Sequence, residues 1–332
     1  MGSKKQICRN DESRDTGMKQ DNGRMNISVI ISTYNRSASL RRTLEHIDQM
    51  SVPEDMKWEL IVIDNNSKDD TRDVAETFCT RTTISFKYFH ESRQGLSFAR
   101  NTGIQSASGE IIVFTDDDVI VDRDWIRNIS KAFEKYDAAC IGGKILPEWE
   151  KPPPVWLKGK LLEYLALCDY GEETVRMTEP RVWGANLAVR ASMFQKYGLF
   201  NTTLGHTGGK LYGGEEQQYL ERLLESGENI FYCPDILVHH CIPAYRIDKA
   251  YFRKWISDKG ELSALQMGEY NKRNIFGVPL IVVRKTFQSM VLCMLEPFSR
   301  STEDMQNQLN LYFNLGIIKG RLKHYKTKTE SN

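Results

Sequence analysis

The chain has 332 residues, of which 40% are hydrophobic and 27% charged, and 45 Lys and Arg against 44 Asp and Glu give a net charge of +1. This balance is typical of a soluble globular protein and excludes a disordered or fibrous chain, and the near-neutral charge excludes a global basic field for binding nucleic acid. The seven cysteines form no C-x-x-C pair, which argues against a zinc ribbon or a disulfide framework and favours a reducing, cytoplasmic compartment.

The first 24 residues are polar and charged and lack the apolar stretch of a signal peptide, so we expect a disordered leader over residues 1–24. Beyond it, short apolar runs alternate with helical patterns as far as residue 114. They predict strands at 26–32, 60–63, 84–89 and 111–114, and helices at 37–47, 70–79 and 96–107. We expect Ser37 to cap the first helix and Gly109 to end the third.

This alternation predicts an α/β fold, with a doubly wound, mostly parallel sheet that helices cover on both faces. Ligands of such sheets bind beyond the carboxyl ends of the strands. Residues 33–35, Asp64 and residues 116–118 all follow predicted strand ends. We therefore expect these residues to converge on one crevice.

The longest apolar region covers residues 275–298, but three polar residues stand in its middle, and charges at bilayer depth cost about 2.5–3.5 kcal/mol each. A membrane-spanning helix is therefore disfavoured. The spacing instead predicts an amphipathic helix, with Leu280, Val283, Phe287, Val291 and Met294 on one face and Arg284, Lys285 and Gln288 opposite. Such a helix packs on its own domain or lies on a membrane surface, and the sequence leaves both alternatives open.

A run of three carboxylates follows the fourth predicted strand. Asp116 and Asp118 are two residues apart, so in an extended segment their side chains point the same way. Convergent carboxylates suit a hard divalent cation such as Mg²⁺ or Mn²⁺, which can stabilise a diphosphate leaving group. An acidic turn is the alternative interpretation of the same triplet.

Asp64 ends the second predicted strand and has two interpretations of its own. It could accept the N–H of uracil or a similar base, or it could serve the turn that follows, where Ser67 and Asp69 are typical helix-capping residues.

The stretch from about residue 26 to residue 260 resembles glycosyltransferase family 2. The resemblance rests on six blocks in the right order: SVIISTYNR, LIVIDNNSKDDT, GLSFARNTGI..ASGEIIVFTDDDV, WGANLAVR, GGEEQQYLERL and LVHHCIPAYR. It implies the GT-A fold, a nucleoside-diphosphate-sugar donor (UDP-sugar favoured), a divalent metal, Mn²⁺ or Mg²⁺, and inversion at the anomeric carbon. Separately from the resemblance, the composition changes near residue 145, where prolines at 147 and 152–154 break regular structure and tryptophans at 149, 156 and 183 follow. We therefore expect a nucleotide-sugar-binding half at 25–144, an acceptor-binding half at 145–262 and a helical extension at 263–332.

The family's nucleotide-sugar contacts map onto several of these blocks. Asp64 matches the base-contacting aspartate, Asp116 and Asp118 match the D-x-D motif, and Asp118 is the stronger candidate for the metal. Arg93-Gln94-Gly95 departs from the family's Asn-x-Gly, which makes the contacts of that loop less certain. The resemblance implies nucleotide-sugar contacts by Thr33, Tyr34, Asn35, Asp64, Arg93, Gly95, Arg100, Asp116 and Asp117.

An inverting transfer needs a base within reach of the acceptor hydroxyl. Glu215 and Glu216 open a helical pattern, where carboxylates ordinarily interact with the helix dipole. The resemblance gives Glu216 the position of the Asp in the family's Glu-Asp motif, which is the usual base, and here Glu is one methylene longer. Glu215 is the reserve candidate.

The resemblance suggests a further metal ligand and three acceptor or sugar contacts. His240 matches a family histidine associated with metal or diphosphate, although the adjacent His239 makes the register ambiguous. Trp183 could stack on a sugar ring and Asn186 could contact donor or acceptor, with an ordinary buried turn as the alternative. Arg246 could neutralise diphosphate or make a surface salt bridge.

Together these features predict a metal-dependent inverting glycosyltransferase that acts on a glycan, lipid-linked or protein acceptor in cell-surface polysaccharide or glycoconjugate synthesis. We expect no nucleic-acid partner, and a cytoplasmic location at or near the inner membrane surface. A sugar nucleotidyltransferase would carry a Gly-rich phosphate loop, and the loop after the first strand, STYNRSAS, has no glycine. A non-catalytic sugar-binding relative is the other alternative, disfavoured because Asp118 and Glu216 are both present.

Overall fold

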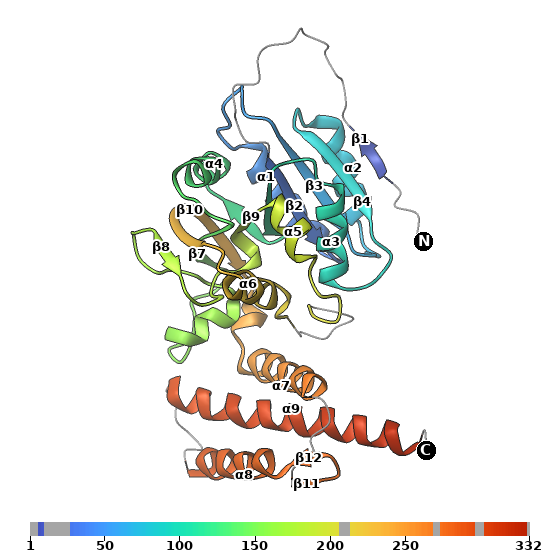
Figure 1. Ribbon diagram of the computed structural model, residues 1–332, viewed down its shortest axis with the longest axis vertical. Helices are drawn as coiled ribbons and strands as arrows, with labels where there is room; N and C mark the ends of the chain where they lie inside the picture. Colours follow the sequence, from blue (N-terminus) through green and yellow to red (C-terminus); the bar gives the residue numbers. More distant parts are fainter. Residues whose placement is uncertain (1–5, 10–26, 206–212, 268–272, 296–301, 331–332) are drawn as a thin grey trace. The chain divides into compact units, whose positions relative to one another are not determined.

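The computed structural model describes residues 6–9, 27–205, 213–267, 273–295 and 302–330 (Figure 1). The chain divides into two compact units, each treated by itself below. The first comprises Met1–Glu148, Ala166–Gly208 and Gly214–Cys241, and the second comprises Trp149–Leu165, Gly209–Gly213 and Ile242–Asn332. The division into donor and acceptor halves at residue 145 concerns function and stays a prediction.

The first unit is built on one mixed sheet, and the predicted α/β GT-A class is confirmed by its topology. Its first part alternates β2 (Ile27–Thr33), α1 (Ser37–Asp48), β3 (Trp58–Asp64), α2 (Thr71–Arg81), β4 (Ser85–His90), α3 (Leu96–Ser106) and β5 (Ile111–Asp116). These strands are parallel and lie in the order β4-β3-β2-β5. Because β-α-β crossovers are right-handed, α1 and α2 cover one face and α3 covers the other.

The strand order reverses between β2 and β5, and a reversal of this kind opens a crevice at the carboxyl ends of the strands. The register there is defined. Thr33 pairs with Asp64 on β3, and Ser32 pairs with Asp116 on β5. The predicted strand ends therefore meet at one edge of the sheet.

Beyond β5 the sheet continues with antiparallel neighbours, in the order β5-β9-β7-β10-β6, and β8 pairs with β10. The elements of this part are β6 (Val119–Val121), α4 (Trp125–Lys135), β7 (Cys140–Trp149), β8 (Val175–Met177), η2 (Gly184–Asn186), β9 (Leu187–Arg190), α5 (Ala191–Tyr197), α6 (Glu215–Glu225) and β10 (Ile230–Ile242). Strand β10 pairs with β6, which directly follows the aspartates at the end of β5. This pairing brings a distant segment of the sequence to the crevice.

The opposite edge carries a strand within the predicted disordered leader. Residues Gln6–Arg9 form β1, which pairs antiparallel with β4. Without it, β4 would be an edge strand with unpaired backbone N–H and C=O groups, and such an edge is a template for further pairing. Most of the leader, residues 1–5 and 10–24, lies outside the described residues.

Two predicted helix ends are wrong. Helix α1 has Arg36 rather than Ser37 at its N-cap, because the Ser37 N–H is already satisfied by Asp69 Oδ2 at 2.9 Å from the neighbouring loop. Helix α3 ends at Ala107 rather than Gly109, because the Gly109 N–H bonds to Ser28 Oγ and continues toward β5. Helix α2 has Asp70 at its N-cap, and the neighbouring Asp69 accepts the Thr71 N–H with its Oδ1.

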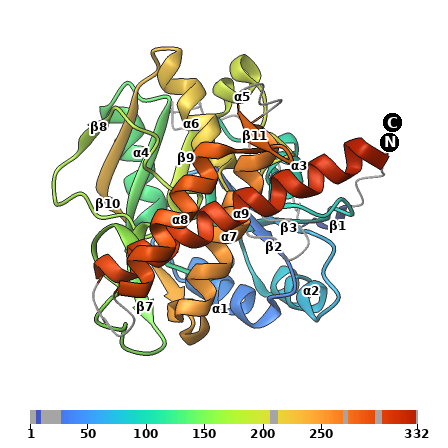
Figure 2. The ribbon, with the colours of Figure 1, turned by 90° about the horizontal axis from the view of Figure 1, so that it is seen from below.

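The second unit is mostly helical. It contains η1 (Gly159–Leu165), η3 (Ala244–Ile247), α7 (Lys249–Gln266), β11 (Asn274–Ile275), β12 (Val278–Pro279), α8 (Leu280–Leu295) and α9 (Thr302–Glu330). Helix α9 is the longest, and it lies between α7 and α8 (Figures 1 and 2). A Cβ at Gly260 of α7 or Gly316 of α9 would collide with the backbone of the facing helix, so these glycines permit the close crossing.

No helix among the described residues is long and apolar enough to cross a membrane. The helix predicted near residues 280–294 is present as α8. Its buried side chains are Val282, Thr286 and Ser289, whereas Phe287 and Met294 of the predicted apolar face are exposed. Helix α8 contacts α9 without burying that apolar face.

Candidate active site

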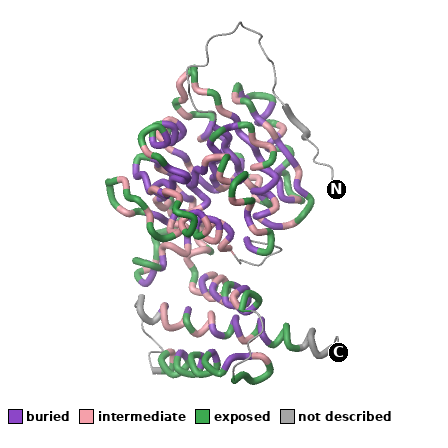
Figure 3. Tube along the Cα trace, viewed as in Figure 1, coloured by how far each residue is buried: buried purple, intermediate pink, exposed green. Residues whose placement is uncertain are grey.

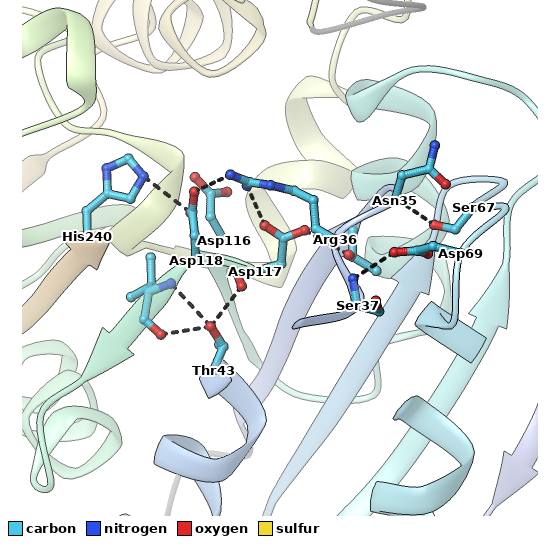
Figure 4. A network of polar contacts seen from close by, with 12 residues as sticks. Asn35, Arg36, Ser37, Thr43, Ser67, Asp69, Asp116, Asp117, Asp118 and His240 are labelled. Atoms are coloured by element: carbon cyan, nitrogen blue, oxygen red, sulfur yellow. Dashed lines mark hydrogen bonds and ion pairs between the residues drawn. The ribbon is translucent and has the colours of Figure 1, made fainter. Parts of the chain in front are cut away.

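Three consecutive aspartates lie at the crevice, and they point in different directions (Figure 4). Asp117 is almost fully buried. It accepts hydrogen bonds from Thr33 Oγ1 at 2.7 Å and from Arg36 Nη1 at 2.7 Å, while its backbone carbonyl accepts one from Thr43. Burial raises the pKa of Asp117 to about 6, although the charge of Arg36 opposes the rise. The predicted nucleotide contacts Thr33 and Asp117 thus bond to each other.

Asp118 is held from two sides. Arg36 Nη2 lies 2.8 Å from its Oδ2, and His240 Nε2 lies 3.2 Å from its Oδ1. On β10, His240 pairs with Val119, and successive side chains of a strand alternate between its faces. His240, rather than His239, is therefore the histidine beside the aspartates (Figure 4).

A second cluster of charges surrounds Arg100 on α3. Its guanidinium lies 2.7 Å from Glu215 Oε1, 3.5 Å from Asp116 Oδ1 and 3.7 Å from Glu216 Oε2. Gly184 leaves room for this side chain, since a Cβ there would collide with the Arg100 nitrogens. Arg100 therefore connects the end of β5 with the first turn of α6.

The two glutamates of this cluster differ in environment. Glu215 has 1% of its side chain exposed and Glu216 has 15%. Burial, together with the charge of Glu216, raises the pKa of Glu215 to about 8, although Arg100 opposes the rise. Glu215 is therefore enclosed beside Arg100, and Glu216 is the more accessible carboxylate.

Asp64 and Asn65 organise the loops beside the crevice. Asp64 Oδ2 accepts a hydrogen bond from the Tyr88 hydroxyl at 2.7 Å, and its Oδ1 accepts the Ser67 N–H at 2.8 Å. Asn65 Oδ1 accepts the Gly95 N–H at 2.7 Å. Gly95 has a φ of 144°, in the region that favours glycine, and directly precedes α3.

Two other predicted nucleotide contacts lie in the loop after β2, and one lies after β4. Tyr34 is exposed, and Asn35 ties this loop to the next, since its Oδ1 accepts the Lys68 N–H at 2.7 Å. Arg93 bonds to Glu91, with 2.6 Å between Nη2 and Oε2.

The predicted acceptor residues have separate environments. Trp183 is half-buried, and its indole N–H has no hydrogen-bond acceptor among the described residues. Asn186 is buried and makes three side-chain bonds, from Trp125 Nε1 and to the carbonyls of Lys144 and Ile236. Arg246 belongs to η3 in the second unit, so its contact with diphosphate stays a prediction.

The donor set around Asp118 fits a divalent cation in part. Carboxylate oxygens of Asp116 and Asp118 with the His240 imidazole are ligands that Mn²⁺ accepts. No group of three or more His, Cys, Asp and Glu side chains in the described part of the chain forms a ready-made metal site. One or two protein carboxylates suffice where substrate phosphates supply the other oxygens, so the residues fit a cation that is shared with a diphosphate.

Sequence reasoning missed three residues that shape the site. Arg36 stands in the SVIISTYNR block, and an Arg next to a strand-end loop could have signalled a partner for the aspartates. Tyr88 and Glu91 carried no local signal. Tyr88 reaches Asp64 because β4 pairs with β3, and Glu91 accepts a hydrogen bond from Thr102 of α3.

The chain is similar to known proteins over most of its length. The family model described as "Glycosyl transferase family 2" matches residues 28–198. The Glucosyl-dolichyl phosphate glucuronosyltransferase of Haloferax volcanii is 28% identical over 234 residues, which cover 68% of this chain and 72% of that protein. The succinoglycan biosynthesis protein ExoM of Rhizobium meliloti is 24% identical over 307 residues, 91% of this chain and 94% of that protein.

Solved structures share the fold. The mannosyltransferase PcManGT from Pyrobaculum calidifontis, in complex with GDP-Man and Mn²⁺, has a TM-score of 0.61 at 17% identity and covers 90% of this chain and 88% of its own. GalNAc-T7, solved with UDP, GalNAc and Mn²⁺, has a TM-score of 0.55 at 16% identity and covers 92% of this chain and 58% of its own.

Proposed function

The chain belongs to glycosyltransferase family 2, and from that membership we propose that it transfers a sugar from a nucleoside-diphosphate donor to an acceptor hydroxyl, with a divalent cation and inversion at the anomeric carbon. A nucleotide-sugar glycosyltransferase is what the family and the relatives establish. The cation, the nucleobase, the stereochemistry and the acceptor are the proposed parts.

One observation carries the proposal. The Arg100 guanidinium lies within 4 Å of Asp116, at the end of the strand that carries the aspartates, and of Glu216, in the first turn of α6. A donor diphosphate at the aspartates and an acceptor hydroxyl at Glu216 would therefore both lie beside this one side chain. An inverting displacement needs the donor and the base positioned in one site, and Arg100 would connect the two.

On the donor side, Asp64 would accept the N3–H of uracil, which favours a UDP-sugar. Its two oxygens are held by the Tyr88 hydroxyl and the Ser67 N–H, which fix the carboxylate while each oxygen keeps a further lone pair. Solved neighbours with the same fold bind either GDP-Man or UDP, so the nucleobase is the part of the donor that most needs measurement.

Asp118, with Asp116 and His240, would hold the cation. When bound, Mn²⁺ or Mg²⁺ would supply Lewis-acid stabilisation of the departing diphosphate. Arg36 is the second positive group at this place, and it keeps Asp117 and Asp118 in fixed directions.

Glu216 would accept the proton of the acceptor hydroxyl. It is the more exposed of the two glutamates, and Glu215, with its raised pKa and its bond to Arg100, would position the start of α6. Trp183, Asn186 and Arg246 stay candidates for sugar or acceptor contacts, and the indole N–H of Trp183 has no acceptor among the described residues.

The acceptor is proposed to be a lipid-linked glycan. One relative is named for action on glucosyl-dolichyl phosphate, a lipid-linked sugar, and another for succinoglycan biosynthesis. The expected cytoplasmic location stays a prediction.

The test is the transfer rate of Glu216→Gln beside Glu215→Gln, with exposed Glu221→Gln on the same helix as the control. Loss of a general base costs about 10²–10⁴-fold in rate. We expect that loss in Glu216→Gln with unchanged affinity for the donor diphosphate, and full activity in Glu221→Gln. Full activity in Glu216→Gln would contradict its role, and a lack of transfer by the intact enzyme with every donor would contradict the proposal as a whole.

A further inference from the structure

Large apolar side chains are exposed on one part of the second unit. Of the 19 large hydrophobic side chains that are exposed among the described residues, ten lie between residues 275 and 294, on α8 and the β11–β12 hairpin before it (Figure 3). We call these ten the α8 surface: Ile275, Phe276, Leu280, Ile281, Val283, Phe287, Met290, Val291, Leu292 and Met294. Phe287 and Met294 are the most exposed, at 68% and 69%.

The inner side of α8, by contrast, is mostly polar. The side chains that it buries are Val282, Thr286 and Ser289, and only Val282 joins the apolar cluster with Ala264, Val278 and Ile317. An amphipathic helix of a water-soluble unit normally buries its large apolar residues. Helix α8 exposes them, and a contiguous exposed apolar patch marks an interaction site.

The charges on this segment have one sign. Between residues 273 and 295 the sequence contains Arg273, Arg284 and Lys285 and no Asp or Glu, although acidic and basic residues are nearly balanced over the whole chain. All three basic residues are exposed. The α8 surface therefore combines apolar side chains with positive charge, which complements an apolar layer bordered by negative groups.

Two other occupants fit less well. A spanning arrangement is disfavoured because Arg284 and Lys285 stand in the middle of α8. In a symmetric pair of chains the same patch meets itself, so the basic side chains would face one another without a carboxylate from this segment.

We propose that the α8 surface binds an anionic lipid bilayer, with α8 in the plane of the membrane and its apolar side chains among the acyl chains. Long basic side chains reach the headgroups while their aliphatic stems stay in apolar surroundings. Attraction to anionic lipid adds to the burial of apolar area. This inference concerns the second unit and goes beyond the proposed transfer reaction.

The experiment is co-sedimentation of the full chain with phosphatidylcholine vesicles, with and without about a third phosphatidylglycerol. We expect binding to the anionic vesicles, at least about tenfold weaker binding to neutral vesicles, and weakening at high salt. The double variant Phe287→Glu, Met294→Glu should lose about tenfold or more in binding. Val155→Glu, at another exposed apolar side chain of the same unit, is the matched control and should bind like the unaltered chain.

Both altered positions of the double variant are exposed, so its thermal melting should match that of the unaltered chain. A chain that stays in the supernatant with anionic vesicles would overturn the inference, as would a double variant that binds undiminished. A lipid-free dimer that the double variant dissociates would assign the α8 surface to a second copy instead. None of these assays needs donor or metal, so a negative result would overturn the membrane inference without bearing on the proposed sugar transfer.

Discussion

The guanidinium of Arg100 lies 2.7 Å from Oε1 of Glu215, and the two side chains are almost fully buried, with 5% and 1% exposed. These residues are 115 positions apart in the sequence. Their ion pair joins α3, which packs on β2 and β3, to the first turn of α6, which carries the proposed base. The position of Glu216 therefore depends on a contact made by its neighbour.

Arg100→Gln should lower the free energy of unfolding by about 3–5 kcal/mol, because it leaves buried carboxylates without their counter-charge. The double variant Arg100→Gln, Glu215→Gln should cost less than the sum of the two single changes, since it removes both partners. Urea unfolding of all four proteins gives the coupling energy. Arg72→Gln, which breaks an exposed pair with Glu76, should change stability by less than about 1 kcal/mol. Strict additivity of the two buried changes would show that the pair is not coupled.

Glu91 predicts a distinct response to acid. Burial alone would raise the pKa of this carboxyl, but hydrogen bonds from Arg93 and Thr102 outweigh burial and lower the pKa to about 2. Because the pKa is lower in the folded state, the stabilisation is present above the ordinary value near 4.5 and is lost as pH falls toward 2. Glu91→Gln should therefore be less stable by about 2 kcal/mol at pH 7, and the difference should shrink toward pH 3.

Urea unfolding at pH 7 and pH 3 measures this difference. Glu76→Gln, at a partly exposed carboxylate on α2, serves as the control and should show little change at either pH. A stability deficit of Glu91→Gln that is the same at both pH values would contradict the pKa assignment.

Asn186 gives a prediction that separates structure from sugar binding. Its amide accepts from Trp125 and donates to the carbonyls of Lys144 and Ile236, which joins α4, β7 and β10. Asn186→Ala should cost about 3 kcal/mol in unfolding free energy, because three buried polar groups lose a partner. Asn128→Ala, which loses one exposed bond to the Asp235 carbonyl, should cost less than about 1 kcal/mol. Unchanged stability with a raised KM would instead identify Asn186 as a sugar contact.

The sequence predicted those parts of the site that depend on strand ends. An apolar run that stops at Asp64 or Asp116 reports both the strand and its carboxyl end, and parallel pairing then brings the ends together. The helical pattern that begins at Glu215 was equally local, and α6 begins there. Such features need no knowledge of distant segments.

The contacts that hold the site were not predictable in the same way. Arg36 turns toward Asp117 and Asp118, which are more than 80 residues away, and Ser37 loses its expected capping role because Asp69 arrives from another loop. The sequence likewise left open what the apolar face of α8 contacts. Periodicity defines the faces of a helix, but the partner that covers one of them is set by the tertiary fold.

The most direct test of the account is thermal stabilisation by UDP, GDP, CDP and dTDP, each with and without Mn²⁺, in the intact chain and in Asp118→Asn. Asp235→Asn, exposed on β10, is the matched control. A ligand at about 100 times its Kd adds about 2.7 kcal/mol to the stability of the folded state. We predict that one diphosphate, UDP first, stabilises the intact chain and Asp235→Asn only when Mn²⁺ is present, and that Asp118→Asn loses this effect. Equal stabilisation without Mn²⁺, or in Asp118→Asn, would contradict the assignment of the aspartates to a cation shared with the donor.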